Sequence, residues 1–65
     1  MKIFDIVITN TGKVGIISEL TDKHKEASIL FINKIDRENE KIAWYKNDEF
    51  KIIGSVINLL KNNNL

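Results

Sequence analysis

The sequence predicts one mainly β domain, a small five-stranded barrel followed by a short C-terminal helix. Short runs rich in β-branched and aromatic residues alternate with polar turns along most of the chain. Only a short polar segment separates the last two runs, which suits a single tight turn. Beyond residue 54 the apolar residues change to a helical spacing.

The first half of the chain contains two predicted strands. Residues 3–9 (IFDIVIT) form the first, and the following turn contains Gly12, which is free to adopt a positive φ. Residues 13–20 form the second, and Gly15 within it predicts a bulge or a tight bend. The polar residues 21–26 then predict a loop.

The second half of the chain contains three predicted strands. Residues 27–33 (ASILFIN) have the strongest strand pattern, and residues 34–40 form a mixed-charge polar connection that we interpret as a solvated hairpin. Residues 41–45 are the fourth strand. Residues 46–49 form a tight turn, and residues 51–53 are a short fifth strand.

A short helix is predicted at residues 56–61. Gly54 ends the fifth strand, and Ser55 is a favourable N-cap. The helix has fewer than two turns, which is too short to be stable alone in water. We therefore expect it to dock on the barrel or on another chain, with a frayed Asn-rich tail after it.

The order of these features resembles the KOW and related SH3-like modules. The matching segments are residues 5–7 (DIV), 12–17 (GKVGII), the apolar strand that follows, and Trp44-Tyr45 before Asp48-Glu49-Phe50. The resemblance covers about residues 5–53 and implies an SH3-like barrel, with nucleic-acid binding as a possible function. The chain differs in having only Lys13 as a basic residue near the glycine turn, and in its C-terminal helix.

The amino-acid composition argues against several classes of function. The chain has no Cys and one His, which argues against disulfides and against thiolate or His-rich metal sites. We expect no cofactor. Net charge is +1, and positive and negative residues cancel locally, so no basic patch is visible. Nucleic-acid binding therefore depends on folding to gather lysines on one face. With no nucleophile–base pair either, we expect no enzyme activity.

The lengths of the apolar runs bear on where in the cell the protein is located. Asp5 interrupts the N-terminal run, so no signal peptide is predicted, and no run reaches the length of a membrane helix. We expect a cytoplasmic protein without a membrane partner. Ile, Lys and Asn supply 12, 9 and 8 of the 65 residues, a bias that suggests a low-GC bacterium and its phages or mobile elements.

The adjacent aromatics Trp44 and Tyr45 should point to opposite faces of a strand. If Trp44 shares a face with Ile42, both point inward, and Tyr45 lies outside with Ala43. Tyr45 then either covers the barrel edge, with its hydroxyl hydrogen-bonded, or stacks on a base or a peptide. Both aromatics are therefore candidate binding residues.

Residues 28–32 (SILFI) are apolar on both faces of the predicted strand. Ile29 and Phe31 share one face, and Leu30 and Ile32 share the other. A half-buried strand should alternate instead. Either the C-terminal helix covers Leu30 and Ile32, or they form a protein interface with another protein or a second copy.

The remaining candidates are charged. Asp48 and Glu49 either cap the tight turn or attract a basic peptide, and Lys13 is the candidate for a phosphate contact. His24 lies in a charged loop and is interpreted as solvent-exposed surface. The leading hypothesis is a non-catalytic protein-binding module, followed by a KOW-like nucleic-acid-binding module and by a structural homo-oligomer.

Overall fold

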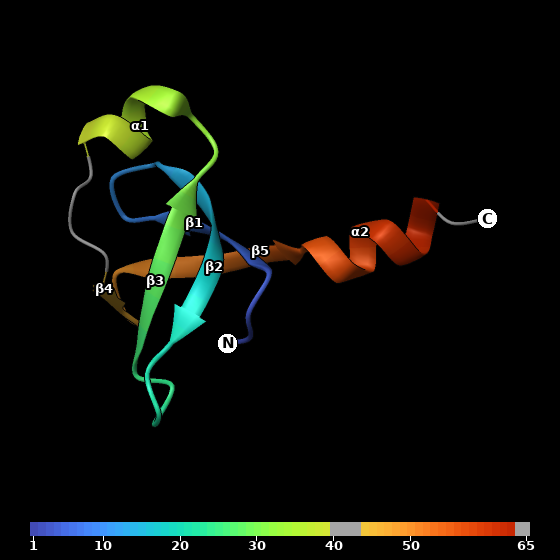
Figure 1. Ribbon diagram of the computed structural model, residues 1–65, viewed down its shortest axis with the longest axis horizontal. Coiled ribbons are helices and arrows are strands. Elements are labelled where there is room, and N and C mark those ends of the chain that lie inside the picture. The colour runs from blue at the N-terminus through green and yellow to red at the C-terminus, as the bar shows by residue number, and fades with distance from the viewer. Residues whose placement is uncertain (40–43, 64–65) are drawn as a thin grey trace.

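The computed structural model describes residues 1–39 and 44–63. In this part of the chain, five antiparallel strands form one sheet in the order β4-β3-β2-β1-β5. The elements are β1 (Asp5–Thr9), β2 (Val14–Leu20), β3 (Glu26–Phe31), α1 (Lys34–Asn39), β4 (Trp44–Lys46), β5 (Phe50–Ser55) and α2 (Val56–Asn63). The first four strands follow one another across the sheet, and β5 returns to pair with β1 (Figure 1).

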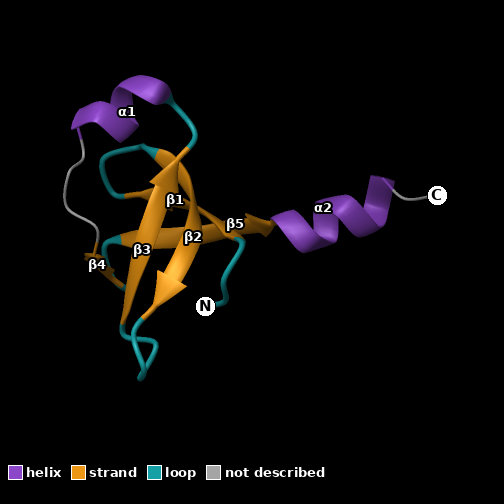
Figure 2. Cartoon of the chain, in the orientation of Figure 1, coloured by secondary structure: helices purple, strands orange, loops and turns teal. Residues whose placement is uncertain are grey.

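This strand order is that of the predicted small SH3-like barrel. A single turn joins β4 to β5, where the Glu49 N–H donates to the Lys46 carbonyl at 2.9 Å. The β5 ribbon runs across the direction of β3 rather than along it (Figure 2). The register shifts between Ile6 and Val7 and between Ile17 and Glu19, and such bulges increase strand twist and bend the sheet.

The core lies on one face of this sheet. Its buried apolar residues come from β1, β2, β3 and the start of β5: Val7, Ile17, Ala27, Ile29, Phe31 and Phe50. Met1, Leu20 and Tyr45 pack against them and are partly buried. The rings of Phe31 and Tyr45 meet edge to face, with centroids 5.9 Å apart.

Several element boundaries differ from the prediction. Strand β1 begins at Asp5 rather than at residue 3, because Phe4 has a φ of 73° and the chain turns there. The buried Asp5 carboxylate closes this turn by accepting the Lys2 N–H at 2.8 Å. Strand β5 and helix α2 are longer than predicted. Of the predicted strand at residues 41–45, positions 41–43 lie outside the described residues.

The polar connection predicted at residues 34–40 was wrong as a solvated hairpin. Residues Lys34–Asn39 form helix α1 instead. Asn33 begins it, because its side-chain Oδ1 accepts the Ile35 N–H at 2.8 Å. The Arg37 guanidinium then donates to the carbonyls of Phe31 and Ile32, at 3.2 and 3.0 Å, and ties the helix to the end of β3.

Gly12 and Gly15, in the first hairpin, are required as glycine for different structural reasons. Gly12 adopts a φ of 84°, as predicted. Gly15 forms neither a bulge nor a bend, which corrects the prediction, since it pairs regularly with Val7 and Phe31. A Cβ there would lie 2.4 Å from the Ile29 Cγ2 atom, so glycine is needed for close packing.

Candidate binding surface

The strand register places six aliphatic side chains on the face of the sheet opposite the core. They form two rows across β1, β2 and β3, and we call them the outer face: Ile6, Ile16 and Leu30 in one row, and Ile8, Val14 and Ile32 in the other. Ile32 follows β3 directly and continues its alternation, and its N–H donates to the Val14 carbonyl at 3.1 Å. No charged residue interrupts either row on these three strands.

The outer face is only partly shielded from water. Leu30 and Ile32 are each 56% exposed, while the four residues on β1 and β2 are half-buried. An antiparallel sheet with one solvated face normally carries polar residues on that face. The alternation has been replaced here by aliphatic residues in both parities, which is typical of a surface that another molecule covers.

Trp44 extends this face onto β4. It pairs with Ser28, which has the same parity as Leu30, and it is 41% exposed. Tyr45 pairs with the buried Ala27 and packs on the core. The predicted orientation of the two aromatics was therefore wrong, because the register with β3 turns Tyr45 inward. The proposed companions of each aromatic, at positions 42 and 43, lie outside the described residues.

The C-terminal helix does not cover the outer face, so the predicted cover of Leu30 and Ile32 by this helix was wrong. Helix α2 contacts β1 and β5, at the opposite edge of the sheet from β4. It then extends away from the sheet (Figure 1). Leu30 and Ile32 on the β3 side therefore keep their exposure.

An open depression borders the second row, between the β1–β2 turn and the start of α1. It has a volume of about 420 Å³ and is lined by Gly12, Val14, Ile32, Asn33 and Asp36. Two of these residues belong to the outer face, so its apolar surface continues into the depression. Asp36 adds a carboxylate, and the candidate residue Lys13, which is half-buried, lies between two of the lining residues in sequence.

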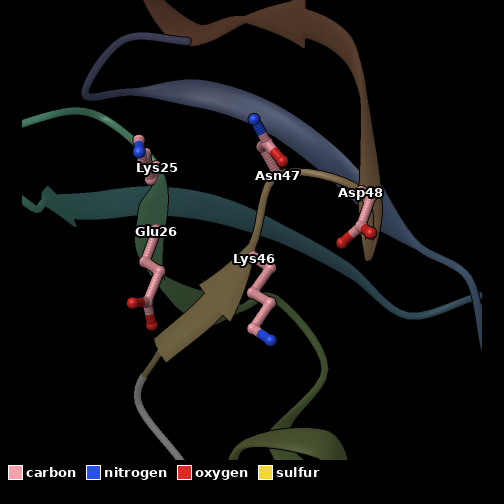
Figure 3. Close-up of a pocket in the computed structure, with 5 residues that line it drawn as sticks. All are labelled: Lys25, Glu26, Lys46, Asn47 and Asp48. Carbon is pink, nitrogen blue, oxygen red and sulfur yellow. The ribbon is translucent and has the colours of Figure 1, made fainter.

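A second depression lies at another place, where the β2–β3 loop meets the β4–β5 turn. It has a volume of about 340 Å³ and is lined by Lys25, Glu26, Lys46, Asn47 and Asp48 (Figure 3). Glu26 and Lys46 are cross-strand partners, and the Asn47 N–H donates to the Lys25 carbonyl at 3.2 Å. Charges of both signs line this depression, and no aliphatic residue does.

The two acidic candidates, Asp48 and Glu49, lie in different surroundings. The Glu49 carboxylate accepts the Lys46 N–H at 3.0 Å, which confirms that it caps the turn. Asp48 is exposed at the second depression, and its carbonyl accepts the Asn10 side-chain amide at 3.1 Å. Because Tyr45 is turned toward the core, the predicted acidic lip beside an exposed tyrosine does not form.

Four members of the outer face were missed by the sequence analysis: Ile6, Ile8, Val14 and Ile16. The signal was present, because residues 6–8 and 14–17 are apolar in both parities, as residues 28–32 are. Within the described ranges, no group of three or more His, Cys, Asp or Glu residues could hold a metal ion. None of the described helices has the length and apolar character needed to cross a membrane.

No family model, curated protein or solved structure matches this chain.

Proposed function

We propose that this chain is a non-catalytic protein-binding module and that its outer face is the contact surface. The observation that carries the proposal is the pair of uninterrupted aliphatic rows on β1, β2 and β3. Removing such side chains from water is favourable by about 25 cal/mol for each Å² of apolar surface covered. A partner that covers Leu30 and Ile32 would therefore gain affinity without any charged contact.

The chemistry of this face favours protein over nucleic acid. Aliphatic side chains offer neither positive charge for phosphates nor hydrogen bonds for base edges. Trp44 at the border fits a protein interface as well, since aromatic residues are enriched at interface cores. The +1 net charge supports the same choice.

The absence of catalysis and the cellular setting belong to the same proposal. The single His of the chain, His24, is exposed in the β2–β3 loop, which offers no enclosed environment for acid–base chemistry. Composition alone supports a cytoplasmic accessory or inhibitory protein of a phage or mobile element in a low-GC bacterium.

Site-specific photo-crosslinking in the native cell tests the proposal. A photoreactive residue at Leu30 should capture a discrete protein, whereas one at the exposed loop residue Lys23 should not. The captured protein, once purified, should bind the wild-type chain and lose at least about tenfold in affinity for the Leu30→Glu variant. The proposal is wrong if Leu30→Glu binds that protein as tightly as the wild type does.

Salt dependence separates the nucleic-acid alternative. Binding through the outer face should change little with ionic strength, whereas phosphate binding weakens steeply as salt rises. An amide-resolved NMR titration with mixed single- and double-stranded nucleic acid at low and near-physiological salt makes the comparison. Shifts that cluster at Lys13 and residues 21–26 and shrink with salt would favour the alternative.

A further inference from the structure

A second apolar surface lies at the other edge of the sheet, around α2. Its exposed members lie in the N-terminal segment, at the end of β5 and on the helix: Ile3, Phe4, Ile53, Ile57, Leu59 and Leu60. We call these residues, together with the half-buried Val56, the α2 surface. It shares no residue with the outer face, so conclusions about the two are independent.

Helix α2 is attached to the sheet at its N-terminal end. The Val56 N–H donates to the Phe4 carbonyl at 3.0 Å, and the helix contacts β1 and β5. The rest of the helix projects away from the sheet (Figure 2). Ile57, Leu59 and Leu60 are 47%, 51% and 64% exposed as a result.

Such a helix needs a covering surface to be stable. Isolated helices shorter than about 12 residues are marginal in water, and α2 has 8 residues. Tertiary packing of an apolar stripe normally supplies the missing stability. The apolar stripe of α2 consists of Val56, Ile57, Leu59 and Leu60, and the described part of the chain leaves the last three about half exposed or more. Most of the stripe is therefore open to a surface from another chain.

The chain exposes more surface than a compact monomer of its mass. A compact monomer of 7.5 kDa exposes about 4,250 Å², whereas this chain exposes 5009 Å². The excess of about 750 Å² is close to the roughly 800 Å² that each partner buries in a standard interface. The radius of gyration, 11.9 Å, also exceeds the value of about 10.7 Å for a compact 65-residue chain.

The charge pattern of the helix suits a second copy of itself. A two-fold interface brings identical surfaces together, so any charge on the stripe would face its own kind. The stripe has none: α2 has no acidic residue in its first turn, and its only described charge is Lys61 in the last turn. At 100° per residue, Lys61 lies about 120° from the centre of the stripe.

We infer that α2 packs against α2 of a second copy of this chain, antiparallel and about a two-fold axis. The two-fold axis passes beside Leu60, close to the middle of the helix, so that Leu60 meets its symmetry mate. Antiparallel packing also places the positive end of each helix dipole beside the negative end of the other. Phe4 and Ile53, at the base of the helix, would border the contact.

Sedimentation equilibrium on the full chain tests this inference. We expect the wild type to approach twice 7.5 kDa as concentration rises. The variants Leu60→Glu and Leu60→Lys should each weaken the dimer by at least about tenfold, because two like charges then meet at the axis. A mixture of the two variants should regain the dimer, since opposite charges then face each other.

Two controls separate this inference from misfolding and from the proposed function. Asn58→Lys adds a charge on the side of α2 opposite the stripe, and Leu30→Glu adds one on the outer face; both should keep the wild-type dimer. A wild type that stays at 7.5 kDa overturns the inference, and a foreign protein or a lipid surface would then cover α2. A mixture of the Leu60 variants that stays monomeric also overturns it.

Discussion

Gly15 shows how the absence of one methyl group lets two strands approach. A Cβ at this position would lie 2.4 Å from the Ile29 Cγ2 atom and 2.9 Å from the Leu30 carbonyl oxygen. The second of these is a backbone atom in the ladder between β2 and β3, so it cannot move without disturbing the hydrogen bonds of the sheet.

We predict that Gly15→Ala lowers the free energy of unfolding by about 1–3 kcal/mol, the usual cost of overfilling a packed site. Urea unfolding followed by circular dichroism measures the change. Gly54→Ala is the matched control, because a Cβ there meets nothing nearer than the Ile6 Cδ1 atom at 3.7 Å. An equal loss in both variants would contradict the role assigned to Gly15.

Trp44 and Tyr45 are neighbours with opposite surroundings. Tyr45 packs on the core and meets the Phe31 ring, whereas Trp44 is 41% exposed on the face opposite the core. The larger aromatic is therefore the one that contributes less to the packing of the free protein.

We predict that Tyr45→Ala lowers the free energy of unfolding by about 2 kcal/mol, less than for a fully buried aromatic. Trp44→Ala should change it by less than about 0.5 kcal/mol, as expected for a surface site. Thermal and urea unfolding followed by circular dichroism give both values. A larger loss for Trp44→Ala than for Tyr45→Ala would reverse the assigned orientations.

Helix α1 shows why a short element is hard to predict from sequence. Its six residues include a single large apolar residue, Ile35, so no periodic pattern marks it. Its contacts come from its flanks instead: the Asn33 side chain caps the first turn, and the Arg37 guanidinium bonds to carbonyls at the end of β3. Such contacts can be recognised only when the end of the preceding strand is known.

We predict that Asn33→Ala costs up to about 1 kcal/mol in the free energy of unfolding, the usual loss on removing an N-cap. Amide hydrogen exchange at Ile35 should rise in the same variant, since its N–H loses its acceptor. Asn39→Ala, at the last position of α1, is the control and should change neither value. Unchanged exchange at Ile35 would show that the cap is not needed.

At the scale of the whole molecule, the five strands were predictable because each strand has its own apolar run, bounded by a turn or a polar connection. That the outer face is left uncovered by α2 was not predictable. The path of α2 depends on where β5 ends, and the strand continues to Ser55, so the helix leaves the sheet at the β5 edge. The orientation of Trp44 depends likewise on the β3–β4 register, which spans the 34–43 segment and cannot be read from local spacing.

The outer face lies on the three central strands of the sheet, whereas the α2 surface lies at its β5 edge, which matters for how a pair of chains would bind. Two copies joined through α2 would carry two outer faces, both left open. A partner with repeated sites could then engage both at once, and the second contact would form at an effective concentration in the millimolar range. Weak single contacts would then add up to strong avidity, so a pair of chains joined in this way would bind a repetitive assembly more tightly than a monomeric protein.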